Sequence, residues 1–405
     1  MIKRKLIIFL LLVLFNQIKL TGFDYEYNLI LKDKIIKPCL RNSVLNPENI
    51  LLLEENLKNT FEPTLELKLY FSDYFSFQLN DAFSIESEES KTTKLTNNIR
   101  ELYLTVTPID FLFIDVGRKV IRKGVSFFKN PVDFVKNKGN IEMSKSKSEQ
   151  TKLLTGSELI NTEIFLKGIT INIIYSPKLE VTEQSVEQFE TILSSQFNTL
   201  NFDFFIYYSE IYKYGLNFSI ILTDYLEFHF EASLIEKQDK WFFTKQYNPF
   251  LSETVETIKY PVNLISGFHF SFENGTELYC EYYYNQTGYS KEQWNRIINE
   301  LESQNNINTL FINSLIDKKG YTELQKHYAM MRIEKNEIIK KINGSFTTVF
   351  EFYYTGAILI PSITYNIIED LDITFFSTVF TGTSKSEFSI IPFNSIYTLE
   401  LKYYF

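Results

Sequence analysis

Five basic side chains lie close together in a chain that is acidic overall, and one aspartate follows them. They stand where a predicted strand ends and a long link begins. Rings of basic side chains attract anionic solutes in pores, so the cluster would line a constriction if the link folds inward. If the link stays outside, the cluster would be a solvated rim that pairs with phosphate groups at a membrane surface. The residues of this candidate constriction are Arg118, Lys119, Arg122, Lys123, Lys129 and Asp133.

Eight acidic residues on predicted strands oppose this cluster. They fall at the polar positions of alternating segments and would face a water-filled interior. If they surround the narrowest section, a channel would favour cations, so the sequence leaves the sign of charge selectivity open. These acids are Glu66, Asp115, Glu227, Glu231, Glu281, Glu351, Asp372 and Glu400.

Catalytic chemistry has little support in the sequence. The chain has three histidines, and two of them, His229 and His269, fall on the polar side of neighbouring strands. With Glu231 they would offer metal ligands, but inward histidines on a polar wall more often have a structural role. The sequence contains no glycine-rich phosphate loop, nucleophile elbow, CxxC or HExxH motif. We therefore expect no enzyme activity, no metal and no cofactor.

The elements that would position these side chains are β-strands, and residues 395–405 (SIYTLELKYYF) show the pattern most clearly. Apolar and polar residues alternate strictly, so one face suits hydrocarbon and the other suits water. Eleven residues are about the length that a tilted strand needs to cross a bilayer. The alternative is an edge strand of a soluble sandwich. The apolar face consists of Tyr397, Leu399, Leu401, Tyr403 and Phe405.

An aromatic final residue after such a strand resembles the assembly signal of bacterial outer-membrane β-barrels. The same alternation recurs along the chain, and residues 65–71 (LELKLYF) nearly repeat the last segment. Short turns, one of them with Asn-Gly at 274–275, alternate with long links at about 122–159, 237–261 and 285–321. Keeping the hairpins in phase requires further strands near 25–34 and 188–195.

These patterns predict an all-β chain that forms a transmembrane antiparallel β-barrel of about 16 to 18 strands, a size that leaves an aqueous channel. Its partners would be outer-membrane lipid, the barrel-assembly machinery and a small polar or anionic solute. The net charge of −9 argues against a nucleic-acid partner. Cys39 and Cys280 are too few for a disulfide framework, and Cys280 falls on the apolar side of its strand.

The beginning of the chain predicts secretion. Residues 1–5 carry three basic side chains, residues 6–15 are apolar, and small residues lie near Gly22. This order is typical of a secretory signal peptide. We therefore expect a signal peptide at 1–22, one barrel domain at 23–405, and integral placement in a bacterial outer membrane.

The most distinctive internal motif lies at residues 114–134. A strand ends in Val-Gly-Arg at 116–118, Gly124 follows six residues after the arginine, and Asn-Pro-x-Asp stands at 130–133. This motif resembles the alginate-export-like group of outer-membrane channels, which implies a passive channel. Two positions depart from the usual pattern of that group and leave the solute open, namely Lys119 and Lys123.

Gly117 decides how Arg118 is oriented. Strict alternation places Arg118 on the lipid face with Val116, where it would extend to the membrane interface. A bulge at Gly117 would instead turn Arg118 into the lumen. Gly117 would also allow a neighbouring backbone to approach closely.

One outer loop should contain a short helix. Ser290 and Gln293 have the spacing of a capping box, and Trp294, Ile297, Ile298 and Leu301 share one helical face. This helix would pack on the barrel mouth or on another loop, with a pore plug or a partner contact as alternatives.

The predicted function is passive diffusion of small polar or anionic solutes. The alternatives are a surface structural or adhesion protein anchored by a barrel, and a barrel lipid hydrolase with a Ser or Thr beside an outer-wall histidine.

Overall fold

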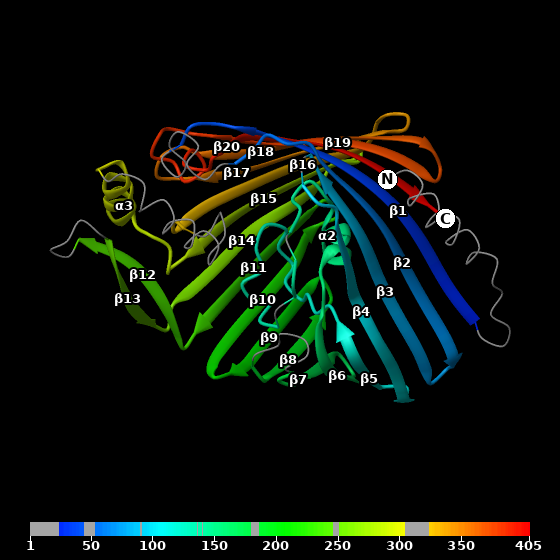
Figure 1. Ribbon diagram of the computed structural model, residues 1–405. Helices are drawn as coiled ribbons and strands as arrows, with labels where there is room; N and C mark the ends of the chain where they lie inside the picture. Colours follow the sequence, from blue (N-terminus) through cyan, green and yellow to red (C-terminus); the bar gives the residue numbers. More distant parts are fainter. Residues whose placement is uncertain are drawn as a thin grey trace.

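The alternating segments form one closed sheet. The computed structural model describes residues 24–43, 53–89, 91–135, 137–139, 141–179, 186–245, 251–303 and 324–405, so the predicted signal peptide at 1–22 lies outside the described residues. Eighteen strands pair in an antiparallel sheet, and β1 pairs with both β2 and β20 (Figure 1). Because the first strand pairs with the last, the sheet closes into a barrel.

The strands and helices have the following bounds. The barrel begins with β1 (Asp24–Leu40), β2 (Lys58–Ser72), β3 (Phe75–Glu88), β4 (Lys94–Ile109), β5 (Leu112–Lys119), β6 (Ser157–Leu166), β7 (Ile169–Ser176), β8 (Gln188–Phe197) and β9 (Leu200–Ser209). It continues with β10 (Ile211–Thr223), β11 (Leu226–Ile235), β14 (Val262–Ser271), β15 (Thr276–Asn285), β16 (His327–Ile339), β17 (Ile342–Glu351), β18 (Ala357–Ile368), β19 (Leu371–Thr381) and β20 (Phe393–Tyr404). Outside the sheet of the barrel lie β12 (Lys237–Lys245), β13 (Leu251–Lys259), α2 (Lys147–Leu153) and α3 (Lys291–Ser303).

The two faces of the sheet differ in polarity, as the alternation predicts. On β20 the outer residues Leu399 and Leu401 are 45% and 42% exposed, whereas the inner residues Thr398 and Glu400 are buried. An apolar outside and a polar inside suit hydrocarbon around the barrel and water within it. Exposed aromatic side chains gather where strands meet the short turns, as in an interfacial girdle. They include Phe71, Tyr74, Phe111, Phe165, Phe197, Tyr225 and Phe272. Among the described residues, no helix is long and apolar enough to cross a membrane.

The predicted strand ladder is confirmed, with the strand number at the upper limit of the expected range. The strands required near 25–34 and 188–195 are present as β1 and β8, and both are longer than expected. Turns of two to four residues join the strands at one end of the barrel, whereas the longer links after β1, β5 and β15 leave the strands at the other end. The Asn-Gly turn joins β14 to β15, and Gly275 adopts φ +76° there.

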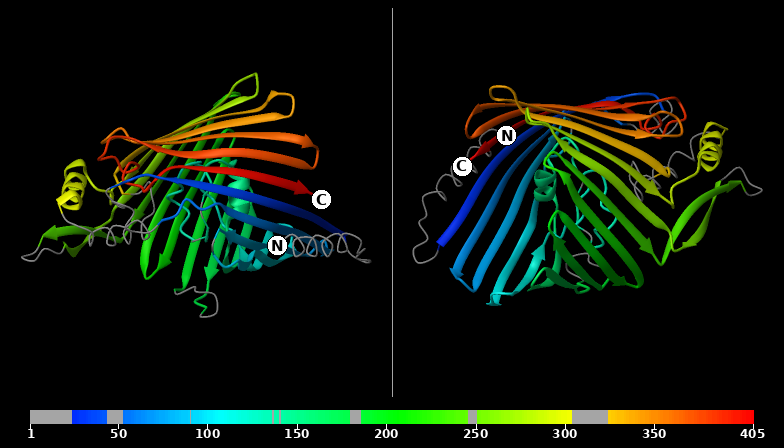
Figure 2. Two further views of the ribbon diagram at one scale, coloured as in Figure 1. Left: turned by 45° about the horizontal axis from the view of Figure 1, so that its top comes forward. Right: turned by 180° about the vertical axis from the view of Figure 1, so that it is seen from behind.

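The link at 237–261 differs from the long loop that we expected. It forms the separate hairpin of β12 and β13, with Lys237 paired to Lys259 and Lys245 paired to Leu251. Residues 254–258 (TVETI) are rich in β-branched side chains, which favour strands, and this explains the difference. Figure 2 shows the hairpin and α3 at the same end of the barrel.

The predicted outer helix is confirmed as α3. Ser290 Oγ accepts from the Gln293 N–H at 3.3 Å, and Gln293 Oε1 accepts from the Ser290 N–H at 2.9 Å, so the capping box is complete. The buried Trp294 donates from its indole N–H to the Lys385 carbonyl at 2.7 Å. Ile297 and Ile298 are also buried, while the side chain of Leu301 lies outside the described part. The helix therefore packs on the link between β19 and β20, one of the two expected partners.

Candidate functional site

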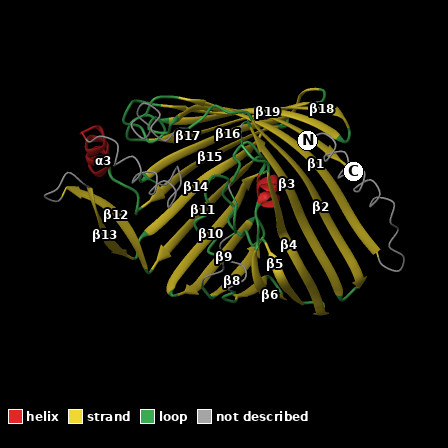
Figure 3. Ribbon diagram, in the orientation of Figure 1, coloured by secondary structure: helices red, strands yellow, loops and turns green. Residues whose placement is uncertain are grey.

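The link between β5 and β6 folds into the barrel, and we name its described residues, 120–135, 137–139 and 141–156, the constriction loop. On one side, the N–H of Ser126 donates to Glu231 Oε1 of β11 at 2.7 Å. On the other side, Lys145 forms an ion pair with Glu400 of β20. Figure 3 shows α2, which belongs to this loop, enclosed by the strands. The loop therefore crosses the interior from one wall to the other.

The constriction loop fills one part of the interior with apolar side chains. Phe134 packs edge-on against Phe205 of β9, with ring centroids 6.4 Å apart. Phe128 contacts Tyr283 of β15 in a similar way, at 6.0 Å. Two buried clusters result, one along β6 to β9 and one along β14 to β19. The apolar side chains of the loop therefore block the parts of the interior that these two clusters occupy.

Open space lies along β20, β1, β2, β3 and β4 on one side of α2, and along β16 to β20 on the other. A cavity of about 890 Å³ at the short-turn end shares Lys68 and Gln78 with a cavity of about 400 Å³. The latter shares Glu66 and Lys152 with a cavity of about 50 Å³ beside α2. A further cavity of about 340 Å³ also adjoins α2. The smallest of the four therefore lies between α2 and the wall.

Charged side chains dominate the lining of this smallest cavity, which we name the charged passage. Five are basic and four are acidic, so the lining carries a net of one positive charge. They come from α2 and its N-terminal flank on one side and from β1, β2, β4 and β20 on the other. The charged residues are Lys32, Glu62, Glu66, Arg100, Lys145, Glu149, Lys152, Glu400 and Lys402.

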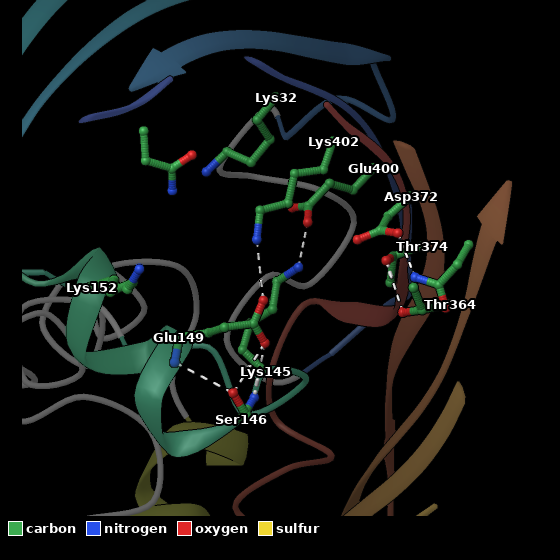
Figure 4. Close-up of polar contacts among 12 residues, drawn as sticks. Lys32, Lys145, Ser146, Glu149, Lys152, Thr364, Asp372, Thr374, Glu400 and Lys402 are labelled. Atoms are coloured by element: carbon green, nitrogen blue, oxygen red, sulfur yellow. Dashed lines mark hydrogen bonds and ion pairs between the residues drawn. The ribbon is translucent and has the colours of Figure 1, made fainter. Parts of the chain in front are cut away.

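Ion pairs hold α2 against the wall. Lys402 Nζ lies 3.2 Å from Glu149 Oε1, and Lys145 contacts Glu400 (Figure 4). Lys152 Nζ lies 3.2 Å from Glu66 Oε2. In these contacts all three loop residues pair with a strand residue of opposite charge.

The local structure of α2 orients two of these side chains. Ser146 Oγ accepts from the Glu149 N–H, and the Glu149 carboxylate accepts from the Ser146 N–H, which is a capping box. Burial raises the pKa of Glu149, but Lys402 and Lys145 lower it by more, so the net pKa is below the usual value. Burial lowers the pKa of Lys145, but Glu400 and Glu142 raise it by more. Both groups therefore stay charged near neutral pH.

The predicted constriction residues mostly shape the loop. Asp133 Oδ1 accepts from the N–H groups of Lys123 and Gly124 at 2.8 and 2.9 Å. Arg122 donates to Gln150 Oε1 at 3.3 Å. The ammonium of Lys129 lies 5.7 Å from the centroid of the Phe128 ring. The loop folds inward as the first alternative proposed, but none of the six predicted residues lines the four cavities. Their effect on solutes stays a prediction.

β5 continues in register through Gly117. Arg118 pairs with Leu102 of β4 and with Glu158 of β6, so it lies in the outward row, and the predicted inward bulge is wrong. Its Nε donates to Glu158 Oε1 at 2.8 Å, and Nη1 donates to the Ile99 carbonyl at 2.7 Å. A Cβ on Gly117 would lie 2.3 Å from the Leu102 carbonyl oxygen, so the glycine permits a close backbone approach instead.

The predicted acids fall on the inner side of the barrel. Asp115 is buried and accepts from Lys119 Nζ at 2.5 Å, so Lys119 also faces inward. Glu227 shares the inner row of β11 with His229 and Glu231. Three of the acids line cavities, namely Glu66, Asp372 and Glu400. Three others are buried and accept backbone N–H groups, namely Glu231, Glu281 and Glu351.

The histidines have structural contacts. His229 Nε2 lies 3.1 Å from Glu281 Oε1, and a Cβ on Gly267 would crowd this nitrogen at 2.8 Å. The His269 ring stacks on Tyr279 at 4.2 Å on the inner wall. Across the described chain, no three side chains of the metal-binding types gather to hold an ion.

No arrangement among the described histidines matches the hydrolase alternative. His269 Nε2 lies 3.4 Å from both Ser271 Oγ and Glu277 Oε2. A nucleophile relay needs the serine and the acid at different ring nitrogens. His327, in the outward row of β16, contacts the Tyr282 hydroxyl at 2.6 Å rather than a serine or threonine.

Sequence reasoning did not identify α2 or most of the charged passage. The spacing Ser146-x-x-Glu149 is a capping box that the sequence displays, so the helix was detectable. Its contact with β20 was not, because Lys145 and Glu400 are 255 positions apart and meet only after the barrel closes.

No protein-family model matches this sequence, and no curated protein matches it either. Solved structures match along nearly the whole chain. The Acinetobacter baumannii protein OccAB1 is 9% identical with a TM-score of 0.58, and the match covers 95% of this chain and 98% of that one. Pseudomonas aeruginosa OccK5 (OpdH) is 10% identical with a TM-score of 0.56, covering 94% and 98%. The outer membrane protein OprD from Pseudomonas aeruginosa is 8% identical with a TM-score of 0.53, covering 95% of each chain. This chain therefore has the fold of these β-barrel proteins.

Proposed function

We propose that this protein is an outer-membrane channel through which small polar or anionic solutes diffuse passively. The observation that carries the proposal is the charged passage, which the constriction loop leaves beside β20, β1 and β2 while its apolar residues pack against β6 to β9 and β14 to β19. A barrel that served only as a membrane anchor would need no charged narrowing of this kind. The net positive charge of the lining favours anions over cations of the same size.

The outer-membrane location rests on three observations. The outer face is apolar, exposed aromatic side chains lie at the short-turn rim, and the fold is that of OprD, which is described as an outer membrane protein. A signal peptide at 1–22, a single domain at 23–405 and an assembly signal at the last strand belong to the same proposal. The likeness of residues 114–134 to the alginate-export-like group also belongs here, and the role of this motif in folding the constriction loop supports it.

Single-channel recording in planar lipid bilayers tests the proposal. Refolded protein should give discrete conductance steps, and the reversal potential in a KCl gradient should show a preference for chloride. Protein whose far-ultraviolet circular dichroism shows an intact barrel but which gives no conductance steps would refute the channel function.

A surface protein anchored by a barrel is the second candidate. The observation in its favour is the ordered secondary structure at the end of the barrel that carries the long links. There α3 packs on the link between β19 and β20, and the β12–β13 hairpin projects from the barrel. Deleting residues 237–259 separates the two candidates. A channel should keep its conductance steps, whereas a surface protein should lose binding to its target.

A further inference from the structure

Two buried carboxylates hold the constriction loop on the wall that lies opposite the charged passage. Glu231 of β11 and Glu281 of β15 are 0% and 3% exposed. Glu231 Oε1 accepts from the Ser126 N–H at 2.7 Å. Glu281 accepts from the next two N–H groups, with Oε1 2.6 Å from Phe127 N and Oε2 2.8 Å from Phe128 N. Three consecutive N–H groups of the loop therefore donate hydrogen bonds to two acidic side chains of the barrel wall.

Each of these three hydrogen bonds should be stronger than one between neutral groups at the surface. A carboxylate that accepts backbone N–H groups forms charge-assisted hydrogen bonds, and burial strengthens them because water cannot compete. The rings of Phe127 and Phe128 belong to the apolar cluster that surrounds them. His229 Nε2 is a further neighbour of Glu281. The acids therefore select one position for this segment of the loop.

Three further hydrogen bonds tie the segment at 122–128 to α2. Lys147, the first residue of α2, donates from Nζ to the Gly124 carbonyl at 2.8 Å. Arg122 donates to Gln150 Oε1 and to Thr151 Oγ1, both at 3.3 Å, in the second half of the helix. A shift of residues 122–128 would therefore displace α2, because these hydrogen bonds connect the segment to the start and the middle of the helix.

From α2, the contacts continue to the passage. Lys145 precedes the helix, and Glu149 and Lys152 belong to it, and all three line the charged passage. The series of contacts thus runs from β11 and β15, through residues 122–128, to α2 and the opposite wall. No group in the first part of this series lines the passage itself.

We infer that Glu231 and Glu281 are positioning residues that set the width and charge of the passage from the far wall. The inference rests on the proposed channel function. Neither carboxylate would touch a passing solute, because both are buried beneath the loop. They act by fixing where α2 stands relative to β20, β1 and β2.

Glu281→Gln tests the inference, because it keeps the side-chain size but turns one acceptor oxygen into an NH₂ group that faces a backbone N–H. The population of displaced loop should rise about tenfold or more. The single-channel current should become larger or noisier, and the reversal potential should move away from that of the unaltered protein. Lys147→Met, which cuts the link to α2 and leaves both wall acids in place, should shift the reversal potential in the same direction.

Glu351→Gln is the matched control. Glu351 is 2% exposed and accepts the N–H groups of Tyr353, Tyr354 and Gly356 in the turn after β17, away from the constriction loop. It should leave conductance and reversal potential unchanged. A folded Glu281→Gln barrel with unchanged current and selectivity, or an equal shift in Glu351→Gln, would overturn the inference.

A second readout works even if the protein does not conduct. A nitroxide label on Ser148→Cys, an exposed position of α2, with both native cysteines replaced, reports the mobility of the helix. Glu281→Gln should increase label mobility, and Glu351→Gln should not. Absent conductance with increased mobility would reject the channel but keep the positioning role, whereas unchanged mobility would reject the positioning role.

Discussion

Replacing Lys145 by methionine should remove the preference of the channel for anions. The charged passage contains five basic and four acidic side chains, and Lys145→Met leaves four of each. For a monovalent ion about 8 Å away, the lost charge changes the energy by about 0.5 kcal/mol in bulk water and about 2 kcal/mol at the effective dielectric constant of a protein surface. The occupancy of a chloride ion should therefore fall by about two- to thirtyfold.

The assay is the reversal potential in a KCl gradient, measured at low ionic strength because salt screens the effect over about 8 to 10 Å. Lys145→Met should move the reversal potential toward the nonselective value, and Lys145→Glu should move it further, toward cation preference. Lys129→Met is a matched control, because Lys129 belongs to the same loop but does not line the four cavities.

Glu400 provides a second control, since it pairs with Lys145 and is 2% exposed. Removing one partner of a buried ion pair costs about 3 to 5 kcal/mol, so the single variant also strains the contact between loop and wall. The double variant Lys145→Met, Glu400→Gln keeps the net charge of the passage and should recover the original reversal potential. If the single and double variants shift the potential equally, the lining charge does not set selectivity and the reasoning is refuted.

Four further predictions concern the loop and the barrel. Asp133→Ala should destabilise the constriction loop by about 1 to 3 kcal/mol for each backbone N–H left without a partner, whereas Asp133→Asn should be milder; equal proteolysis of the loop in both variants would contradict this. Gly117→Val should lower the yield of heat-resistant folded barrel on gels, because a Cβ there would lie 2.3 Å from the Leu102 carbonyl oxygen in addition to the strain of φ +135°; Gly168→Val carries the strain of φ +79° but meets nothing within 4 Å, so it should retain more. The lowered pKa of Glu149 means that its contribution to loop stability is complete above the ordinary value of 4.5 and is lost as pH falls through the lowered value; current noise that rises already near neutral pH would disagree. Cys280, in the outward row of β15, should react with a lipid-soluble thiol reagent but not with a water-soluble one, after the other cysteine is replaced; the reverse labelling would place it inside.

The fold was largely predictable because the relevant pattern is local. A strand has a side-chain period of two, so the sequence of β20 alone shows which residues face hydrocarbon and which face water. The phase of the hairpins along the sequence also required two further strands, which are β1 and β8. The hairpin of β12 and β13 was predicted as a long loop, although its β-branched residues favour strands.

The candidate site was predictable only in part. The inward loop was one of two alternatives that the sequence left open. The residues of the motif at 114–134 fold that loop instead of lining the narrowing: Asp133 accepts two backbone N–H groups, and Gly124 leaves room where a Cβ would lie 2.3 Å from Asn130. Arg118 turned outward because β5 keeps its register through Gly117, and no rule of composition distinguishes a bulge from a close backbone approach.

The sequence by itself determined that the chain makes a barrel with a polar interior, because alternation and turn residues act over a few positions. Only the tertiary structure decided where the open passage runs and which charges line it. Lys145 and Glu400 are distant in sequence, as are Phe127 and Glu281, and each contact exists only once the sheet has closed and the loop has docked. The part of the interior that stays open depends on which strands the apolar residues of the loop pack against. This packing joins segments that are distant in sequence, so local sequence patterns do not reveal it.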